Sequence, residues 1–474
     1  MSAESSPNGH WSKNFAALSV HRREDWAVTV KGFNKFVWDF EMGPSENPNG
    51  IFQSYGQMLI ANSEGSLLAH DVEKGWDWTR IPGATTMSLT LEETRVKKAR
   101  YFSPRSFAGG VTFKGPEALS NGVFGMDFYQ PDYQFSHSSF PNIKLYFKKS
   151  VFFFQNVIVC LGSNIRIGNG QGKIAQTTLF QDKVQRVDTG GQMRSFSIKV
   201  DGVVKDGSST FAAMVPPLNS QAGYIRLLDT KGNSYYIPAS SASSLKVQIA
   251  NQNSKTPAAK PSSGRYATAW LEHSPSNDNY EYAVYVKSTS YPKSAEFVWN
   301  FQASSRNKKV YKVLQKNDVA HVVKFEMSTV DWREVSPPQF GYVIFSSTTT
   351  LPSDGPIRSS NKPCIIMARE DGGFLYLSVS HPDLAFPNSG HLKTMEDIGV
   401  REYYHIESQE ISITVGLRKR VLKTLPAQPM VHGSPAEYVP TVQVKSTNPT
   451  LPKGNKIVFS NLKNGFSVEV KLRK

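Results

Sequence analysis

Hydrophobic and polar residues alternate along many short stretches of this 474-residue chain, and clusters of Gly, Asn, Ser, Asp or Pro separate the stretches. Alternation with a period of two residues is typical of a strand that buries one face. Groups that tolerate positive φ stand where hairpins would reverse. The turn groups are Lys231-Gly232-Asn233, Lys205-Asp206-Gly207 and Glu370–Gly373. The predicted strands include Trp26–Gly32, Ser195–Val200, Tyr282–Lys287, Phe374–Val379, Ile411–Val415 and Phe466–Leu472.

Helical periodicity is scarce. Ser294–Gln302 is the best candidate for a helix, and a second candidate is Ser88–Lys97, where two glutamates would open a turn. The densest apolar run, Ser150–Gly162, is interrupted by Gln155 and Asn156, so it predicts a buried strand pair with a turn between the strands. No repeat of fixed period is present. The pattern therefore predicts an all-β protein built from packed sandwiches.

Two places in the chain have the composition of a joint between domains. Asn251–Arg265 is rich in Pro, Ser, Ala and Lys and predicts an exposed loop, either a linker or an insertion within one sandwich. The second candidate is Ser336–Gly341, together with the segment 351–363. A chain of this length has room for two or three domains. We therefore expect a large domain over residues 1–340 and a smaller one over residues 341–474.

The composition is that of a globular protein, with 39% hydrophobic residues and a mean hydropathy of −0.37. No stretch reaches the length of an uncharged apolar membrane span, so we expect no membrane insertion. The first residues lack the basic start and apolar core of a signal peptide. Cys160 and Cys364 lie far apart in apolar segments, where buried free thiols are the expected state.

The chain is strongly basic, with 54 Lys and Arg against 39 Asp and Glu, a net charge of +15. Such a surplus attracts polyanions: nucleic acid, an anionic membrane and an acidic polysaccharide all fit. The basic residues are spread through the chain in small clusters, Lys97-Lys98-Arg100 among them. No nucleic-acid motif surrounds any of these clusters, so we expect no nucleic-acid partner.

Cofactor and metal motifs are missing from the sequence. Gly168–Lys173 reads GNGQGK, but a β-like segment follows it instead of a helix, so a hairpin loop is favoured over a phosphate-binding loop. The ten His residues are scattered, with no HExxH, and the two Cys residues lack metal-ligand spacing. We expect neither a cofactor nor a metal.

Two stretches combine aromatic and ionisable residues as a sugar-binding cleft does: KGFNKFVWDFE, Lys31–Glu41, and GWDWTRIPGATT, Gly75–Thr86. Aromatic faces stack on pyranose rings, while a carboxylate or a guanidinium binds the polar ring substituents. A third stretch, NGIFQSYG, Asn49–Gly56, adds polar side chains on one strand face. The candidate site residues are Glu41, Gln53, Tyr55, Trp76, Trp78 and Arg80.

At these residues the sequence resembles the hyaluronate and chondroitin lyase family of polysaccharide lyases, with chondroitin ABC lyases the nearest in pattern. The similarity runs in the family's order from about residue 7 to about residue 385. It passes through KGFNKFVWDFE, FQSYG, EKGWDWTRIPGATT, LGSNI, TTLFQ, WLEHS, YEYAVYV, YKVLQKNDVAHVV and NKPCIIMARE.

The resemblance implies a large galactose-mutarotase-like β-sandwich and a smaller carboxy-terminal sandwich, without the α/α toroid that precedes them in the family. It also implies β-elimination from uronic-acid-containing polysaccharides of the chondroitin, dermatan sulfate or hyaluronan type, outside the cell. In the family a Tyr, a His and an Arg come from the helical domain, and a carboxylate from the β domain matches Glu41. Glu41 is thus the expected catalytic residue, and Gln53, Tyr55, Trp76, Trp78 and Arg80 are expected substrate contacts.

Three hypotheses follow. The chain is the β portion of a lyase that needs a helical domain and is inactive alone, because one Glu cannot supply base, acid and charge neutralisation together. Alternatively, it is a non-catalytic module that binds acidic polysaccharide. The third hypothesis is a structural sandwich without a ligand.

Overall fold

The computed structural model describes the chain over fourteen segments: 7–43, 46–63, 69–136, 143–169, 172–187, 191–214, 223–289, 295–304, 307–327, 334–386, 408–423, 429–432, 438–446 and 450–474. The described residues form antiparallel sheets, with two short α-helices, α2 (Ala239–Ala242) and α3 (Ala295–Ala303). Two 3₁₀ turns, η1 (Asn14–Ala16) and η2 (Gly50–Phe52), lie in the amino-terminal part. The all-β class predicted from the alternation is confirmed.

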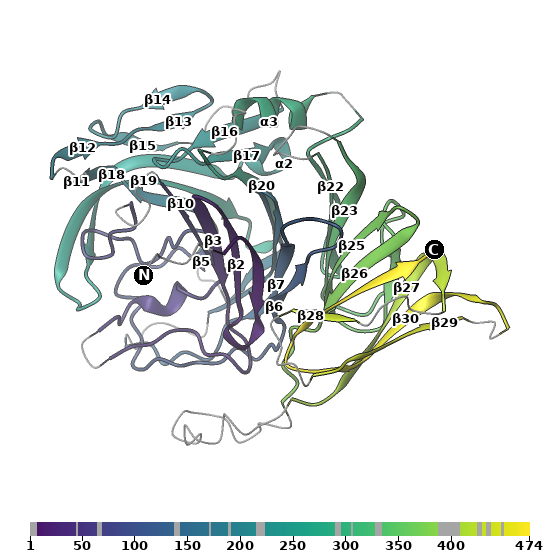
Figure 1. Ribbon diagram of the computed structural model, residues 1–474. Helices are drawn as coiled ribbons and strands as arrows, with labels where there is room; N and C mark the ends of the chain where they lie inside the picture. Colours follow the sequence, from purple (N-terminus) through teal and green to yellow (C-terminus); the bar gives the residue numbers. More distant parts are fainter. Residues whose placement is uncertain are drawn as a thin grey trace, which may run out of the picture.

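Three sheets and one small hairpin make up the amino-terminal part of the molecule (Figure 1). A four-stranded sheet holds β1 (Gly9–Lys13), β2 (Leu18–Arg23), β3 (Trp26–Lys31) and β4 (Gln57–Asn62). A five-stranded sheet has the order β15 (Phe211–Met214), β18 (Leu245–Lys255), β19 (Pro261–His273), β10 (Ala175–Lys183) and β5 (Thr85–Met87). A nine-stranded sheet has the order β14 (Val203–Lys205), β13 (Ile198–Val200), β16 (Tyr224–Leu228), β17 (Ser234–Pro238), β20 (Ser276–Tyr285), β9 (Val157–Gly168), β8 (Lys144–Phe154), β7 (Asn121–Tyr129) and β6 (Ala108–Phe113). The hairpin pairs β11 (Gln185–Val187) with β12 (Met193–Ser195).

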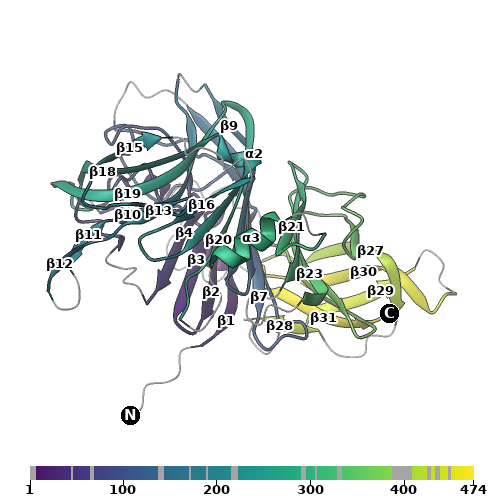
Figure 2. The ribbon, with the colours of Figure 1, turned by 90° about the horizontal axis from the view of Figure 1, so that it is seen from above.

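Two further sheets form the carboxy-terminal part, drawn in green and yellow in Figures 1 and 2. A seven-stranded sheet has the order β21 (Tyr311–Lys316), β22 (Ala320–Met327), β23 (Glu334–Ile344), β25 (Cys364–Asp371), β26 (Phe374–Ser380), β31 (Ser467–Arg473) and β28 (Met430–His432). A four-stranded sheet has the order β24 (Ile357–Ser360), β27 (Ile411–Leu422), β30 (Lys453–Leu462) and β29 (Thr441–Lys445).

The sheets pack as successive layers with a hydrophobic core in each gap. One core lies between the nine-stranded sheet and the two smaller amino-terminal sheets, and it includes Phe153 of β8. The next core joins the opposite face of the nine-stranded sheet, including Phe152, to the seven-stranded sheet. A third core lies between the seven-stranded and the last four-stranded sheet. Because both faces of β8 and β9 are covered, the run Ser150–Gly162 is apolar at nearly every position.

Most of the predicted elements form. Five of the six predicted strands coincide with β3, β20, β26, β27 and β31, whereas Ser195–Val200 is divided between the end of β12 and the short β13. The helix expected over Ser294–Gln302 is α3. The second predicted helix, Ser88–Lys97, is wrong. Thr90 and Glu93 exchange capping hydrogen bonds around a single turn, and Val96 then pairs with Phe135 in an isolated bridge.

Two loop predictions are corrected by the sheet pairing. Asn251–Arg265 is a regular hairpin, with Asn251 opposite Arg265 and Lys255 opposite Pro261, since backbone pairing does not require apolar side chains. Figure 1 shows this β18–β19 hairpin curving around the loops of the amino-terminal part. The GNGQGK segment, of which residues 170–171 lie outside the described part, joins β9 to β10, which belong to different sheets, so the connection is not a hairpin.

The expected domain limit at residue 340 lies within β23, which pairs with β22 on one side and β25 on the other. The seven-stranded sheet therefore takes strands from both sides of this limit, and the division into 1–340 and 341–474 stays a prediction. Cys160 and Cys364 are buried free thiols, as predicted. Among the described helices none is long and apolar enough to cross a membrane.

Candidate functional site

Glu41 lies on an irregular two-stranded ribbon formed by residues 34–41 and 95–105. Backbone hydrogen bonds hold the two segments antiparallel: Lys35 N donates to Arg105 O at 2.8 Å, and Asp39 N donates to Tyr101 O at 3.0 Å. Arg100 N donates to Phe40 O at 3.3 Å. We call these residues the Glu41 ribbon.

The Glu41 carboxylate is exposed and held in place by a guanidinium. Arg100 Nε and Nη2 both lie 2.9 Å from Glu41 Oε2, and the two side chains are 42% and 58% exposed. The Arg100 guanidinium also lies 6.0 Å from the ring of half-buried Trp38. Arg100 has a φ of 66°, which costs a non-glycine residue roughly 1–2 kcal/mol. The backbone is therefore strained at the residue that orients Glu41.

The exposed charges of the ribbon are almost all positive. Glu41 is the one exposed carboxylate of the two segments, and the exposed cations number six. These cations are Lys35, Arg95, Lys97, Lys98, Arg100 and Arg105. A surface with this charge attracts anionic polymers.

The ribbon also contains a buried carboxylate, that of Asp39. Asp39 is 3% exposed, and its Oδ1 accepts hydrogen bonds from the N–H of Phe40 at 2.8 Å and of Tyr101 at 2.9 Å. Its Oδ2 accepts the hydroxyl of Tyr133 at 2.8 Å, and Tyr133 in turn accepts the hydroxyl of Tyr55 at 3.1 Å. Burial raises the pKa of Asp39 to about 7, against the lowering effect of these hydrogen bonds. Asp39 thus joins both segments next to the Glu41–Arg100 pair.

Asn47 links Glu41 to Gln53. Its Nδ2 donates to the backbone oxygen of Glu41 and to Oε1 of Gln53, at 3.0 Å each. Its backbone N–H donates to Pro257 O at the tip of the β18–β19 hairpin. Nearby, Asn49 Nδ2 donates to Leu91 O at 2.7 Å. The segment 46–53 therefore connects the Glu41 ribbon with the loop 88–94.

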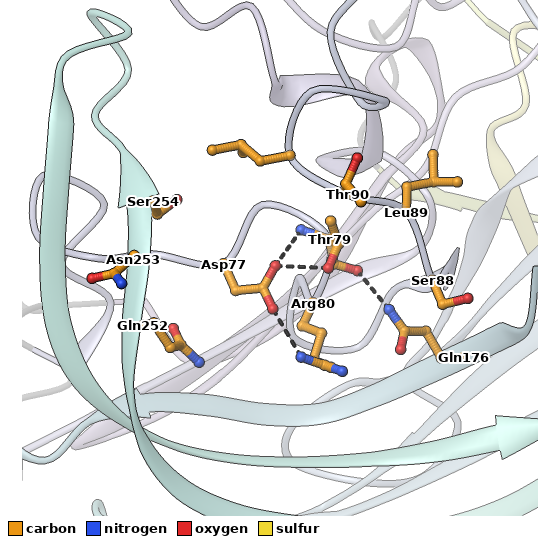
Figure 3. Close-up of a pocket in the computed structure, with 11 residues that line it drawn as sticks. Asp77, Thr79, Arg80, Ser88, Leu89, Thr90, Gln176, Gln252, Asn253 and Ser254 are labelled. Atoms are coloured by element: carbon orange, nitrogen blue, oxygen red, sulfur yellow. Dashed lines mark hydrogen bonds and ion pairs between the residues drawn. The ribbon is translucent and has the colours of Figure 1, made fainter. Parts of the chain in front are cut away.

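That loop borders a polar pocket that contains Arg80 (Figure 3). The pocket has a volume of about 350 Å³ and exposes amides, hydroxyls and one ion pair. Arg80 Nη1 lies 3.0 Å from Asp77 Oδ2, and the guanidinium stacks 4.1 Å from the ring of Trp270. The lining residues, which we call the Arg80 pocket, are Asp77, Thr79, Arg80, Ser88, Leu89, Thr90, Leu91, Gln176, Gln252, Asn253 and Ser254.

The loop carrying Arg80 is fixed to the five-stranded sheet. Gln181 of β10 accepts the N–H of Asp77 at 2.8 Å and donates to Arg80 O at 2.8 Å. Gly75 has a φ of 77°, and a Cβ there would lie 2.1 Å from Gly264 N. Only glycine permits this close approach to the β18–β19 hairpin.

The aromatic candidates lie in the core instead of lining the pocket. Trp76 and Trp78 are each 2% exposed, and Trp78 Nε1 donates to Lys255 O at 2.8 Å. Tyr55 is fully buried, and burial raises its pKa well above the usual value. Trp76 and Trp78, where the sequence led us to expect aromatic stacking, offer no ring face to a sugar in this structure, and the Tyr55 hydroxyl donates to Tyr133. They position the loops that carry Glu41, Gln53 and Arg80.

Sequence reasoning missed the partners of the predicted residues. The sequence shows Arg100 within a basic cluster, which is usually a solvated face, and nothing in the pattern pairs that cluster with Glu41. Asp39 lies within KGFNKFVWDFE, but nothing in the sequence predicts that its side chain is buried. Trp270, which supports Arg80, comes from a strand almost two hundred residues later. In the described part of the chain, no group of three or more His, Cys, Asp or Glu residues could hold a metal ion.

Comparisons with known proteins support the family resemblance. Residues 11–295, more than half of the chain, match the family model of polysaccharide lyase family 8, super-sandwich domain. The chain is 27% identical over 463 residues to a chondroitin sulfate ABC exolyase of Proteus vulgaris. It is 29% identical over 384 residues to a chondroitin sulfate ABC endolyase of the same organism. The two alignments cover 91% and 80% of this chain but only 41% and 34% of these relatives.

Solved structures show the same fold. A Paenibacillus xanthan lyase matches with a TM-score of 0.68 at 19% identity, over 99% of this chain and 38% of that protein. A chondroitin AC lyase of Streptomyces coelicolor matches with a TM-score of 0.63 at 15% identity, over 99% of this chain and 50% of that protein. The all-β architecture without a helical toroid, which the resemblance implied, is confirmed for the described residues, and its large part matches the super-sandwich domain of the family model. The chain belongs to polysaccharide lyase family 8.

Proposed function

We propose that this chain forms the β wall of a lyase cleft that acts on acidic glycosaminoglycans of the chondroitin, dermatan sulfate or hyaluronan type when combined with a helical domain. The observation that carries the proposal is Glu41, an exposed carboxylate held by Arg100 on a surface with six exposed cations. The residue matches the catalytic carboxylate expected from the family resemblance. Because the chain spans less than half of the curated relatives, the activity of a whole enzyme is part of the proposal.

β-Elimination needs three contributions. A base removes the C5 proton, a positive group stabilises the charge that develops on the uronate, and an acid protonates the leaving oxygen. The two segments of the Glu41 ribbon contain no His. Tyr133 lies below them, but burial foremost, and then the neighbouring Asp39, raise its pKa well above the usual value. Glu41 therefore orients other groups, and we expect the isolated chain to be inactive or nearly so.

The positive charge of the Glu41 ribbon also favours an anionic substrate. The two relatives are named for chondroitin sulfate, and the exposed ribbon cations favour such a polyanion here. The amides and hydroxyls of the Arg80 pocket would bind neutral parts of the polymer. Arg80 and Gln53 stay candidate substrate contacts, and they are the two such candidates that are not fully buried.

Turnover by the isolated chain and by the chain joined to a helical domain of a family 8 lyase tests the proposal. The readout is the ultraviolet absorbance of the unsaturated uronate product formed from chondroitin sulfate. Product should form with the helical domain and not without it. Robust product formation by the isolated chain would contradict the division of roles.

Glu41→Gln tests the assigned residue in the two-domain protein. It should abolish turnover while leaving the thermal midpoint nearly unchanged, because the side chain is 58% exposed. The matched control is Glu410→Gln, which alters another exposed glutamate, 3.5 Å from Lys463 and 55% exposed. Equal turnover in the two variants would exclude a catalytic role for Glu41.

The alternative is a module that binds acidic polysaccharide without chemistry. In that case Glu41→Gln would change little. Affinity for chondroitin sulfate would then fall in Lys97→Ala/Lys98→Ala and weaken with salt, because both lysines are exposed. Binding without product, in the presence of the helical domain, would favour this alternative over the lyase.

A further inference from the structure

A second cavity lies where three sheets meet at their edges. β1, β6 and β28 are the outermost strands of the first four-stranded, the nine-stranded and the seven-stranded sheet. Residues of all three strands line the cavity, and in Figure 1 β6 and β28 lie where the amino-terminal and carboxy-terminal parts meet. The cavity has a volume of about 520 Å³, within the usual range of about 300–1,000 Å³ for ligand pockets. Its described lining residues, which we call the junction pocket, are Asn8, His10, Trp11, Ser12, Lys13, Thr112, Lys114, Ala118, Leu119, Ser120, Met430 and His432.

Side-chain hydroxyls fix the walls of the junction pocket. The edge strand β1 donates its free N–H groups to them: His10 N to Ser120 Oγ at 2.7 Å, and Ser12 N to Thr112 Oγ1 at 3.0 Å. Thr112 N in turn donates to Ser467 Oγ of β31 at 2.9 Å. The three sheet edges are therefore held in register, and the pocket is formed before any ligand binds.

The buried carboxylate of Glu469 holds Lys114, Gly115 and His432 in place next to the pocket. Its carboxylate accepts the N–H groups of Lys114 at 2.9 Å and Gly115 at 2.7 Å. His432 Nε2 lies 2.8 Å from the same carboxylate. Because Glu469 is 4% exposed and already has these partners, it offers little negative charge to a ligand in the pocket.

The described lining is positive and contains no Asp or Glu. Lys13 and Lys114 are exposed at the rim, and His432 is half-buried. His10 contributes no charge, because burial foremost, then Arg23 and His432, lower its pKa to about 3. The positive groups that a ligand would meet are thus the two lysines.

The uncharged part of the lining suits a sugar ring. Trp11 is half-buried, and Leu119 and Met430 are 38% and 44% exposed at the rim. An aromatic face with apolar neighbours binds the C–H face of a pyranose, while the half-buried Ser12 presents a hydroxyl that can still donate. An inorganic anion alone would use the cations but not the indole.

We propose that the junction pocket binds one anionic sugar unit, sulfated or uronic, of an acidic polysaccharide. None of its lining residues belongs to the Glu41 ribbon or to the Arg80 pocket. The proposal rests on the proposed function only for the class of polymer. A long chain bound at both sites gains affinity because the second contact becomes intramolecular.

Calorimetric titration of the full chain with a chondroitin sulfate tetrasaccharide tests the proposal. Lys13→Ala/Lys114→Ala should weaken binding by about tenfold, since two charge contacts are lost. The matched control is Lys97→Ala/Lys98→Ala, which removes the same charge from the Glu41 ribbon. Titration of each double variant with the same tetrasaccharide separates the two sites. Equal affinity of Lys13→Ala/Lys114→Ala and the native chain would overturn the proposal.

Tryptophan fluorescence locates the bound sugar. Binding of the tetrasaccharide should change the emission, and Trp11→Phe should remove this change while the thermal midpoint stays near that of the native chain. Inorganic sulfate and an unsulfated neutral disaccharide are the two comparison ligands. If sulfate binds as tightly as the tetrasaccharide, the site takes a free anion and the sugar assignment is wrong. Because the readout is binding, its failure leaves turnover by the two-domain protein untouched.

Discussion

Asp39→Asn should change how the stability of this protein depends on pH. Asp39 is a buried residue of the Glu41 ribbon, and its pKa rises from the ordinary 3.8 to about 7, chiefly because burial disfavours the charge. The groups that face it are the hydroxyl of Tyr133, the N–H groups of Phe40 and Tyr101, and the ammonium group of Lys31, whose own pKa burial lowers to about 8. About three pKa units at about 1.4 kcal/mol each give about 4 kcal/mol.

The sign follows from proton counts. Between pH 4 and 7 the native chain keeps the proton of Asp39 that the unfolded chain has lost, so stability falls as pH rises through this window. The contribution is fully present below about pH 4 and lost above about pH 7. An asparagine does not titrate, so Asp39→Asn removes this dependence. Relative to the native chain, the variant should gain stability with rising pH, by up to about 4 kcal/mol.

Thermal unfolding at pH 4.5, 6, 7 and 8 measures the effect. With an unfolding entropy of about 2.1 cal/mol/K per residue, a single cooperative transition of 474 residues moves by about 1 °C per kcal/mol. The midpoint difference between variant and native chain should therefore rise by a few degrees, up to about 4 °C, between pH 4.5 and 8. Asp132→Asn, at a carboxylate 90% exposed, is the control for the loss of one surface charge. A constant difference for Asp39→Asn would refute the reasoning.

Three further substitutions test other charges. Lys231→Met leaves the buried carboxylates of Asp182 and Asp229 without the ammonium group that pairs with both, so the free energy of unfolding should fall by about 3–5 kcal/mol. A thermal midpoint within about 1 °C of the native value would contradict this. Arg80→Lys keeps the positive charge but loses the stacking on Trp270. Calorimetry should show that this variant binds chondroitin sulfate severalfold more weakly than the native chain, and that Arg80→Ala binds it more weakly still. Native affinity in both variants would exclude Arg80 as a substrate contact. Arg100→Ala should barely change the thermal midpoint, because its ion pair with Glu41 is exposed. It should lower turnover of the two-domain protein. Unchanged turnover would show that Arg100 is not needed to orient Glu41.

The sequence predicts the sheets well wherever one face of a strand is buried. β3, β26 and β31 show the alternation because their inward side chains pack in the cores. The distal half of the β18–β19 hairpin escapes prediction because both of its faces are polar. The backbone ladder holds it, together with hydrogen bonds from Asn47 and Trp78. Residue composition in such a segment is that of a loop.

The candidate site was predictable only in part. The family resemblance predicts Glu41 as the catalytic residue, but its partner Arg100 is 59 residues away and belongs to a segment without regular structure. Trp76 and Trp78 show a second reason why the prediction was incomplete. A tryptophan beside charged residues gives the same sequence pattern whether its ring faces a ligand or the core. Their indoles are buried, and the loops they support present the polar groups. Exposure, which decides the role of an aromatic residue, is a property of the packing.

The geometry of Glu41 is consistent with the proposal that a second domain completes the site. Arg100 uses both of its nitrogen contacts on Oε2, and Oε1 has no hydrogen-bond partner among the described residues. A carboxylate held on one oxygen is oriented and still able to accept a donor from across the cleft. Since an exposed ion pair contributes only about 0–1 kcal/mol, Arg100 would not prevent such a donor from binding. The ribbon thus provides an oriented acceptor on a basic surface, and the proton transfers of an elimination would have to come from the facing domain.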